Sequence, residues 1–382
     1  MSRTLIITND FPPRPGGIQT FGYEIAKRFE PKSLTVLTSN WEGAVEFDTA
    51  QEFKVVRAGT RTLVPSKKTL RMAQEIVASE DITRVLFGAA APLGLLAAPL
   101  RKSGVQHIVG MTHGHETGWA MTPGTRQLLR KIGNDTDFLT YISEYTHKKI
   151  AKALSPEAAK RMRRITPGVD VVEFSPSNAN SGKQLRESLG WSDRPVIVCV
   201  SRIMARKGQD ELVRALPNIH ESAPNASLII VGDGPYRKEV ERLVARSGLE
   251  SFVHLTGKVS QGDLSKWYAA GDIFAMPCRT RVGGWDVEGL GIVFLEGSAT
   301  GLPVIVGDSG GAPDAVIHGE TGFLVNGSET EEIADRISYL LNNPAAAQAM
   351  GEAGRNWVAS EWSWDRNFKK LDGLLSGLDS VD

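Results

Sequence analysis

Short apolar runs alternate with amphipathic segments along the whole chain. In the first half, runs of strand length are separated by stretches with helical periodicity. Strands are expected at residues 4–8, 33–38, 54–57, 84–87, 107–111, 138–142 and 164–166, with helices between them, for example at 19–29 and 68–78.

The second half repeats this alternation. Strands are expected at residues 196–201, 227–231, 253–255, 273–276 and 304–306, and helices at 208–216, 236–247, 264–270 and 293–300. Runs such as VIVCV and LIIVG are apolar at nearly every position, which is typical of parallel strands covered on both faces. The pattern predicts an α/β protein with two Rossmann-like, doubly wound domains, the first at 1–168 and the second from 169 onward, divided after Pro167-Gly168.

A length of 382 residues suits two domains better than a single core. The two cysteines, Cys199 and Cys278, lie in apolar runs and cannot build a disulfide framework, so a reducing compartment is expected. A strand begins almost at the N-terminus, and no secretory signal is therefore expected. The most apolar stretch, residues 85–100, contains two prolines and is shorter than a membrane span, which favours a soluble or peripheral protein.

Charge is balanced overall but not along the chain. Residues 1–168 contain 24 Lys and Arg against 15 Asp and Glu, whereas the remaining residues contain 20 against 29. Such a division indicates either that the first half faces an anionic surface or that surface charge is simply uneven.

The first candidate motif, DFPPRPGGI at residues 10–18, connects the first strand to the first helix. Gly16 and Gly17 would allow a ligand to approach the backbone, and the helix N-terminus behind them favours phosphate or sugar oxygens. A tight strand-to-helix turn would require glycine as well, so the motif alone leaves both interpretations open.

The second motif, RIMARKG at residues 202–208, follows the strand VIVCV. Open α/β sheets bind ligands outside the carboxyl ends of their strands. Arg202 offers a planar fork and Lys207 a point charge, which together suit a diphosphate. The alternative is a solvated basic loop, which is the interpretation favoured for Arg206.

The third motif runs from Glu288 to Glu296, two glutamates about two helical turns apart. A helix starting near Gly289 would place Glu288 in the preceding loop, near a sugar, and Glu296 further along, where a carboxylate can accept ribose hydroxyls. The amides of Gly289 and Gly291 would face sugar or phosphate oxygens. Two surface glutamates on a helix are the alternative, although Glu296 stands in an apolar setting.

These motifs resemble those of the retaining GT-B glycosyltransferases of family 4. The stretch from Glu288 to Glu296 is followed by GLPVI at 301–305 and Gly310-Gly311, and GDGP at 232–235 and TGFLV at 321–325 match in the same order. The segments NDFPPRPGGIQTF and THGHE resemble, more narrowly, the actinobacterial GDP-mannose-dependent phosphatidylinositol mannosyltransferases. The resemblance covers nearly the whole chain and implies a GT-B fold, with an acceptor domain, 1–168, and a donor domain, 169–362, facing across a cleft. It also implies that a final helix at about 363–382 packs back on the first domain.

The resemblance also implies residue roles. Arg202 and Lys207 would bind the donor diphosphate, Glu288 a hydroxyl of the transferred sugar and Glu296 the ribose. His113 would lie near the reacting carbon, with His115 as a second candidate. The catalytic set so implied is His113, Arg202, Lys207 and Glu288. The donor-binding set is Gly16, Gly17, Arg202, Lys207, Gly232, Lys258, Val259, Gly289, Leu290, Gly291, Ile292, Val293 and Glu296.

The implied reaction transfers α-mannose, with retention, from GDP-mannose to a phosphoinositide-type glycolipid at the cytoplasmic face of the plasma membrane. No His/Cys cluster has metal-ligand spacing, and none of the motifs requires a divalent metal. Neither a required metal nor a tightly bound cofactor is therefore predicted, and no nucleic acid partner is expected. Another donor or acceptor, a sugar-nucleotide epimerase and a non-catalytic nucleotide-sugar sensor remain alternatives.

Two segments of the first domain mix cations with apolar side chains, as interfacial helices do. Either segment could instead be an ordinary amphipathic helix with a solvated face. The first contains Arg61, Leu63, Val64, Lys67, Lys68 and Arg71, and the second contains Arg126, Leu128, Leu129, Arg130 and Lys131.

Overall fold

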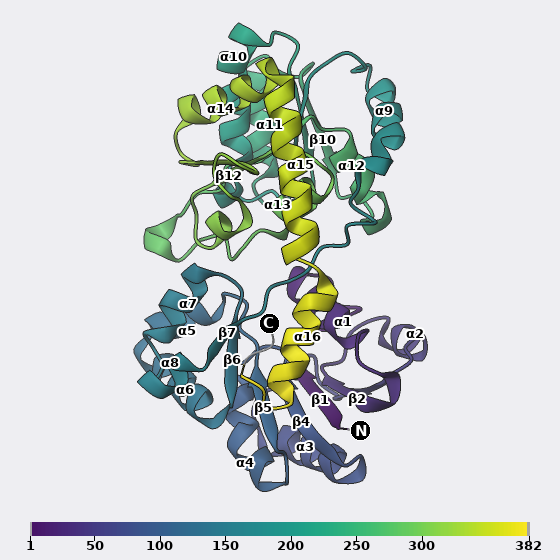
Figure 1. Cartoon of the computed structure of the whole chain (residues 1–382), viewed down its shortest axis with the longest axis vertical. Helices are drawn as coiled ribbons and strands as arrows, with labels where there is room; N and C mark the ends of the chain where they lie inside the picture. The colour runs from purple at the N-terminus through teal and green to yellow at the C-terminus, as the bar shows by residue number, and fades with distance from the viewer. Residues whose placement is uncertain (1, 380–382) are drawn as a thin grey trace. The chain divides into compact units, whose positions relative to one another are not determined.

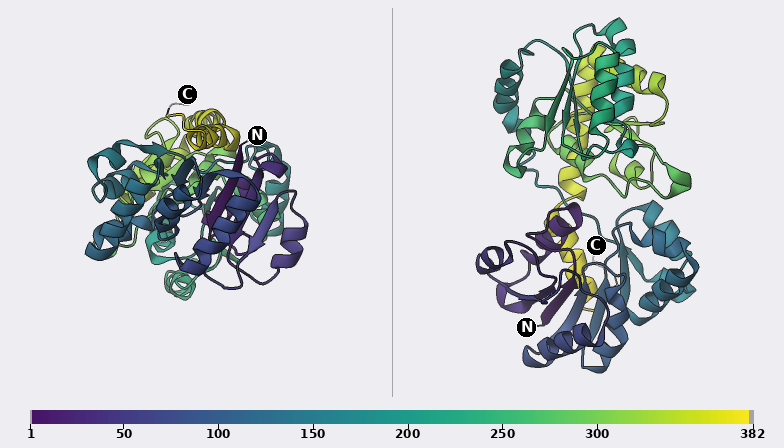
Figure 2. Two further views of the ribbon diagram at one scale, coloured as in Figure 1. Left: turned by 90° about the horizontal axis from the view of Figure 1, so that it is seen from below. Right: turned by 180° about the vertical axis from the view of Figure 1, so that it is seen from behind.

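The computed structural model describes residues 2–379, which form two compact units. One unit contains the chain up to Pro167 together with the segment from Trp364 onward, and the other is Gly168–Ser363. Each unit is a parallel sheet with helices on its faces (Figures 1 and 2). The predicted class, α/β with two doubly wound Rossmann-like domains, is confirmed.

The first unit has a seven-stranded sheet in the order β3-β2-β1-β4-β5-β6-β7. Its inner strands are largely apolar, and Leu5, Ile6 and Ile7 of β1 are at most 2% exposed, because helices cover both faces. The strands are β1 Arg3–Thr8, β2 Leu34–Thr38, β3 Lys54–Arg57, β4 Ile82–Phe87, β5 His107–Gly110, β6 Phe138–Tyr141 and β7 Met162–Arg164. The helices are α1 Gly17–Ala26, α2 Ala44–Thr49, α3 Lys67–Ser79, α4 Ala97–Lys102, α5 Glu116–Met121, α6 Pro123–Asp135, α7 Glu144–Ala151, α8 Pro156–Lys160 and α16 Trp364–Leu375.

The second unit has a six-stranded sheet in the order β10-β9-β8-β11-β12-β13. The strands are β8 Val196–Val200, β9 Ser227–Val231, β10 Val253–Gly257, β11 Ile273–Met276, β12 Val304–Gly307 and β13 Gly322–Val325. The helices are α9 Ala179–Ser188, α10 Gln209–Ser222, α11 Arg237–Arg246, α12 Leu264–Ala269, α13 Ile292–Ala299, α14 Thr330–Asn342 and α15 Pro344–Glu361. Cys199 and Cys278 are free and buried in this unit.

The last helix of the chain, α16, lies across one face of the first unit's sheet (Figure 1). Phe368 meets Phe29 edge to face with the ring centroids 4.9 Å apart. Asp372 accepts a hydrogen bond from Arg84 of β4 at 2.9 Å. These contacts tie α16 to the first unit.

Several predicted elements differ from the structure in their bounds, and one strand was not predicted. Strand β13 was not expected, because four residues beginning with glycine carry little periodic signal. Strand β7 lies two residues before the expected run. Helix α10 continues to Ser222 although Pro217 stands inside it, because buried side chains such as Ile219 lie beyond the proline.

Candidate active site

The candidate residues gather at the same edge of each sheet. Every paired strand is parallel, so within a unit the carboxyl ends meet along one edge. His113 follows β5, the segment from Arg202 to Lys207 follows β8, and Gly232 follows β9. Ligands of doubly wound sheets bind at this edge.

Lys207 and Glu288 form an ion pair in the second unit. Lys207 Nζ lies 2.5 Å from Glu288 Oε2, and each residue is 8% exposed. Lys207 ends a short 3-10 turn, Ala205–Lys207, and Gly208 follows it with φ 79°. A Cβ at Gly208 would lie 2.1 Å from the Pro277 carbonyl oxygen, so this close packing beside the end of β11 requires glycine.

Arg206 and Arg202 have different surroundings. Arg206 is not the solvated side chain that the sequence suggested: its Nη1 lies 3.2 Å from Asp286 Oδ1 and its Nε 3.9 Å from Glu288 Oε2. Arg202 is exposed, and its guanidinium has no hydrogen bond or ion pair within residues 2–379. The structure therefore pairs Lys207 with Glu288, whereas the exposed guanidinium of Arg202 forms no such pair within residues 2–379.

The loop before α13 holds Glu288 from two sides. The Glu288 amide donates to Ser309 Oγ at 3.3 Å, and the Gly311 amide donates to the Glu288 carbonyl at 2.8 Å. Ser309 and Gly311 follow β12. The sequence motif Gly310-Gly311 thus belongs to the support of the glutamate.

The helix in the third motif begins within one residue of the expected run at 293–300, and later than the start near Gly289 from which the positions of the two glutamates were argued. Helix α13 starts at Ile292 with Gly291 as its N-cap at φ 85°, so Gly289 and Leu290 lie in the loop, and Leu290 is 3% exposed. Glycine in this left-handed conformation ends the loop, which is why the helix does not begin at Gly289. The first helical amides are those of Ile292 and Val293, and Glu288 lies in the preceding loop, as expected.

Glu296 lies in the second turn of α13 and accepts a hydrogen bond from Tyr268 Oη at 2.5 Å. Burial raises the pKa of Glu296 to about 7, although the Tyr268 hydroxyl opposes this rise. No sequence motif marks Tyr268, which lies in the helix expected at 264–270.

The donor-binding candidates Gly232, Lys258 and Val259 lie at the ends of β9 and β10. The Gly232 amide donates to the Gly257 carbonyl at 3.1 Å, and a Cβ at Gly232 would lie 2.2 Å from the Ser201 carbonyl oxygen. Lys258 is exposed and Val259 is partly exposed beside them. The ends of three neighbouring strands thus meet at Gly232.

The first unit places its candidates at the ends of β1 and β5. Gly16 is the N-cap of α1 at φ 149°, and a Cβ added at Gly17 would have no neighbouring atom within 4 Å. Gln19 of α1 donates to Asp10 Oδ1 at 2.7 Å and closes the loop. The open side at Gly17 leaves backbone accessible at a helix start.

The hydrogen bonding of His113 defines which of its ring nitrogens carries the proton. Its Nε2 lies 2.6 Å from the Gly88 carbonyl oxygen, which can only accept, so Nε2 carries the proton. Burial lowers the pKa of His113, so the ring is neutral near pH 7 and Nδ1 keeps its lone pair. Glu116, fully buried, accepts the His113 amide at 3.0 Å, and the more exposed His115 lies 3.1 Å from its other oxygen.

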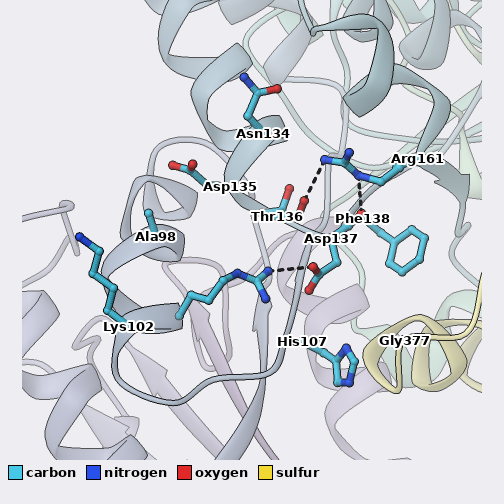
Figure 3. A pocket seen from close by; sticks show the side chains of 11 residues that line it. Ala98, Lys102, His107, Asn134, Asp135, Thr136, Asp137, Phe138, Arg161 and Gly377 are labelled. Carbon is cyan, nitrogen blue, oxygen red and sulfur yellow. Dashed lines mark hydrogen bonds and ion pairs between the residues drawn. The ribbon is translucent and has the colours of Figure 1, made fainter.

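A large hollow of the first unit lies away from this edge. It has a volume of about 830 Å³ and lies beside the amino ends of β5 and β6, with His107 and Phe138 in its lining (Figure 3). An ion pair between Arg101 and Asp137 at 2.8 Å spans part of it. Within residues 2–379 no group of three or more His, Cys, Asp or Glu could hold a metal ion, and no helix is long and apolar enough to cross a membrane.

Comparison with known proteins matches this architecture along the whole chain. A family model for "Glycosyl transferases group 1" matches residues 182–357, and one for "Glycosyltransferase Family 4" matches residues 15–173. The GDP-mannose-dependent alpha-(1-6)-phosphatidylinositol monomannoside mannosyltransferase of Mycobacterium tuberculosis is 44% identical, with 100% of both chains covered. The GDP-mannose-dependent monoacylated alpha-(1-6)-phosphatidylinositol monomannoside mannosyltransferase of Corynebacterium glutamicum is 42% identical, with 98% of this chain and 97% of that protein covered.

Solved structures agree on the fold. Alr3699/HepE of Anabaena in complex with UDP has a TM-score of 0.82 at 21% identity, with 98% of this chain and 100% of that chain covered. WaaG, a glycosyltransferase of lipopolysaccharide biosynthesis, has a TM-score of 0.70 at 20% identity, with the same coverage. Fold and full-length similarity together define an enzyme of the glycosyltransferase class with the GT-B fold. The chain belongs to glycosyltransferase family 4.

Proposed function

We propose that the protein transfers an α-mannosyl group from GDP-mannose to phosphatidylinositol monomannoside, with retention of configuration. The observation that carries the proposal is the full-length identity of 44% to a relative whose name states this donor and acceptor. The buried pair of Lys207 and Glu288 at the sheet edge supports it, because a cation and a carboxylate there suit a diphosphate and a sugar hydroxyl.

The cleavage of the donor develops negative charge on the leaving diphosphate. Lys207, Arg202 and the first amides of α13 are the groups proposed to stabilise that charge, since fixed donors act mainly on the transition state. In the proposed front-face route, the leaving phosphate accepts the proton of the incoming hydroxyl, so no residue has to form a covalent intermediate. Glu288 would then accept a hydrogen bond from a hydroxyl of the transferred mannose.

His113 is proposed to contact the donor sugar from the first unit. With Nε2 bound to the Gly88 carbonyl, only Nδ1 is left to interact with substrate, as a hydrogen-bond acceptor for a hydroxyl. This role requires a neutral imidazole ring, and the lowered pKa of His113 agrees with that requirement.

The test incubates the enzyme with GDP-mannose or UDP-glucose, each with and without phosphatidylinositol monomannoside, and identifies the products by mass spectrometry and NMR. The expected result is an α-linked dimannoside from GDP-mannose and no product from UDP-glucose. The donor should be consumed only when acceptor is present. Acceptor-independent conversion of the donor would indicate an epimerase, binding without turnover would indicate a sensor, and a β-linked product would exclude retention.

The first unit is further proposed to bind the cytoplasmic leaflet through α6 and the residues before it. Leu128 and Met121 are 40% and 37% exposed, and a hollow of about 310 Å³ beside them is lined in part by Arg126 and Arg130. Each cation near an anionic lipid surface contributes roughly 1 kcal/mol. Leu129, expected to share this surface, is instead fully buried.

The other basic segment, residues 61–71, offers less exposed apolar surface to a membrane. Leu63 is 2% exposed and belongs to the core, which leaves Val64, 53% exposed, as the apolar group beside Lys67 and Lys68. The segment at α3 therefore supplies charge rather than a buried apolar anchor.

Liposome sedimentation tests the membrane proposal. The variant Arg126→Glu/Arg130→Glu should lose most binding to anionic vesicles at low salt, whereas Lys67→Glu/Lys68→Glu should lose less. Arg242→Glu/Arg246→Glu, on exposed positions four residues apart on α11 of the other unit, is the matched control and should bind like wild type. Unchanged binding of the first variant would exclude α6 as the membrane surface.

A further inference from the structure

Tyr268 of α12 is the largest fully buried side chain of the described residues. Its ring is fixed between two aromatic side chains: Phe274 stacks on it with the centroids 5.5 Å apart, and Phe174 meets it edge to face at 5.4 Å. The hydroxyl group points to Glu296, with Oη 2.5 Å from Oε2. A phenylalanine would fill the same space, so packing alone does not explain the hydroxyl.

The chemistry of the pair gives the hydroxyl one role. Burial raises the pKa of Tyr268 well above 10, so the phenol stays protonated and can only donate to the carboxylate. A donated hydrogen bond stabilises the charged form of Glu296, against the burial that raises the pKa of this residue. It also fixes the rotation of the carboxyl group, which leaves the other oxygen in one direction.

We propose that Tyr268 is a positioning residue for nucleotide binding: its hydroxyl holds the Glu296 carboxylate in the orientation that accepts the ribose hydroxyls of the donor. The inference rests on the proposed function, because the ribose role of Glu296 is part of it. Tyr268 itself touches no substrate. Its effect reaches the nucleotide only through the carboxylate, and this distinguishes it from a residue that merely supports the core.

The test compares GDP with 2′,3′-dideoxy-GDP, which lacks the hydroxyls that Glu296 would bind. Calorimetry on wild type should show tighter binding of GDP, and Tyr268→Phe should weaken GDP binding about tenfold while changing the dideoxy affinity less than about twofold. Tyr339→Phe is the matched control, because it removes a phenol hydroxyl from a half-exposed tyrosine of the same unit and should leave both affinities unchanged. The KM for GDP-mannose should rise in Tyr268→Phe with little change in kcat.

The outcomes separate the two proposals. If the wild-type protein fails to bind GDP, the proposed donor is wrong. If it binds both nucleotides equally, the ribose role of Glu296 is wrong. Either result also removes the inference on Tyr268. Normal discrimination in wild type, with equal losses for both nucleotides in Tyr268→Phe or with no loss, overturns the positioning role alone. Glu296→Asp is a second arm if Tyr268→Phe does not fold: it withdraws the carboxyl from Tyr268 but keeps the charge, and should lose the preference for GDP.

Discussion

Lys207→Met would remove one charge of a buried ion pair while keeping most of the side chain's volume. In the wild type, Lys207 Nζ and Glu288 Oε2 are 2.5 Å apart, and the two side chains are 11% and 10% exposed. The variant leaves the Glu288 carboxylate without that partner. Removing one member of a buried pair costs about 3–5 kcal/mol, because the remaining charge is uncompensated.

Arg206 reduces this cost. Its Nε lies 3.9 Å from Glu288 Oε2 and would still compensate part of the carboxylate charge. The expected loss of stability is therefore smaller, about 2–3 kcal/mol. A loss of that size lowers the melting temperature of a unit spanning residues 168–363 by roughly 5–10 °C. Thermal unfolding followed by circular dichroism measures it.

A second substitution distinguishes charge from packing. Lys207→Met/Glu288→Gln removes the uncompensated charge and should recover most of the lost stability. Turnover should stay low in both variants. We expect kcat to fall on the order of a hundred- to thousandfold, because a charge-stabilising donor is lost. Arg242→Met, which breaks an exposed pair with Glu239, is the control and should cost less than about 1 kcal/mol. If Lys207→Met melts with the wild type, or the double variant is no more stable than the single one, the reasoning fails.

Three further predictions concern the same unit. Glu288→Gln should impair sugar transfer far more than GDP binding, whereas Glu296→Ala should weaken GDP binding itself; equal losses of GDP affinity by calorimetry would contradict the assignment of roles. Burial raises the folded pKa of Glu296 from 4.5 to about 7, so the folded state holds the proton more tightly, and this stabilisation is complete below about pH 4.5 and lost as the pH rises through 7. The melting temperature of wild type relative to Glu296→Gln should therefore fall from about pH 5 to about pH 8, and a constant difference would contradict the shift. Gly208→Ala should destabilise the protein by more than about 2 kcal/mol, measured by urea unfolding, because φ 79° and the Pro277 carbonyl both oppose a Cβ; a smaller loss would show that the loop can move away.

The fold could be predicted from the sequence because buried parallel strands are apolar at nearly every position. VIVCV shows this for β8. The alternation of such strands with helices then predicts the α/β fold. Boundaries were less predictable. The strand at residues 162–164 is polar except for Met162, so local hydrophobicity could not place it, and the proline at 217 looked like a helix end although tertiary packing carries α10 past it.

The contacts of the candidate site were less accessible to sequence reasoning. Lys207 and Glu288 are far apart in the chain, and only the adjacency of β8 and β11 brings their loops together. The motif spacing identified both residues without showing that they neutralise each other. Tyr268 carried no signal, because a tyrosine whose hydroxyl serves a partly buried carboxylate cannot be told from a core aromatic by periodicity alone.

The glycine-rich motifs acquire two different physical explanations from the structure. The sequence suggested that such glycines let a ligand approach the backbone. Gly232 does not need that explanation, because a Cβ there would already lie 2.2 Å from the Ser201 carbonyl of the neighbouring strand end. Gly17 has no atom within 4 Å of the corresponding position, so packing of the protein itself does not require glycine there. An alanine at Gly232 should therefore damage the fold, whereas an alanine at Gly17 should be tolerated by the fold and should reveal, through the KM for the donor, whether a ligand needs that space.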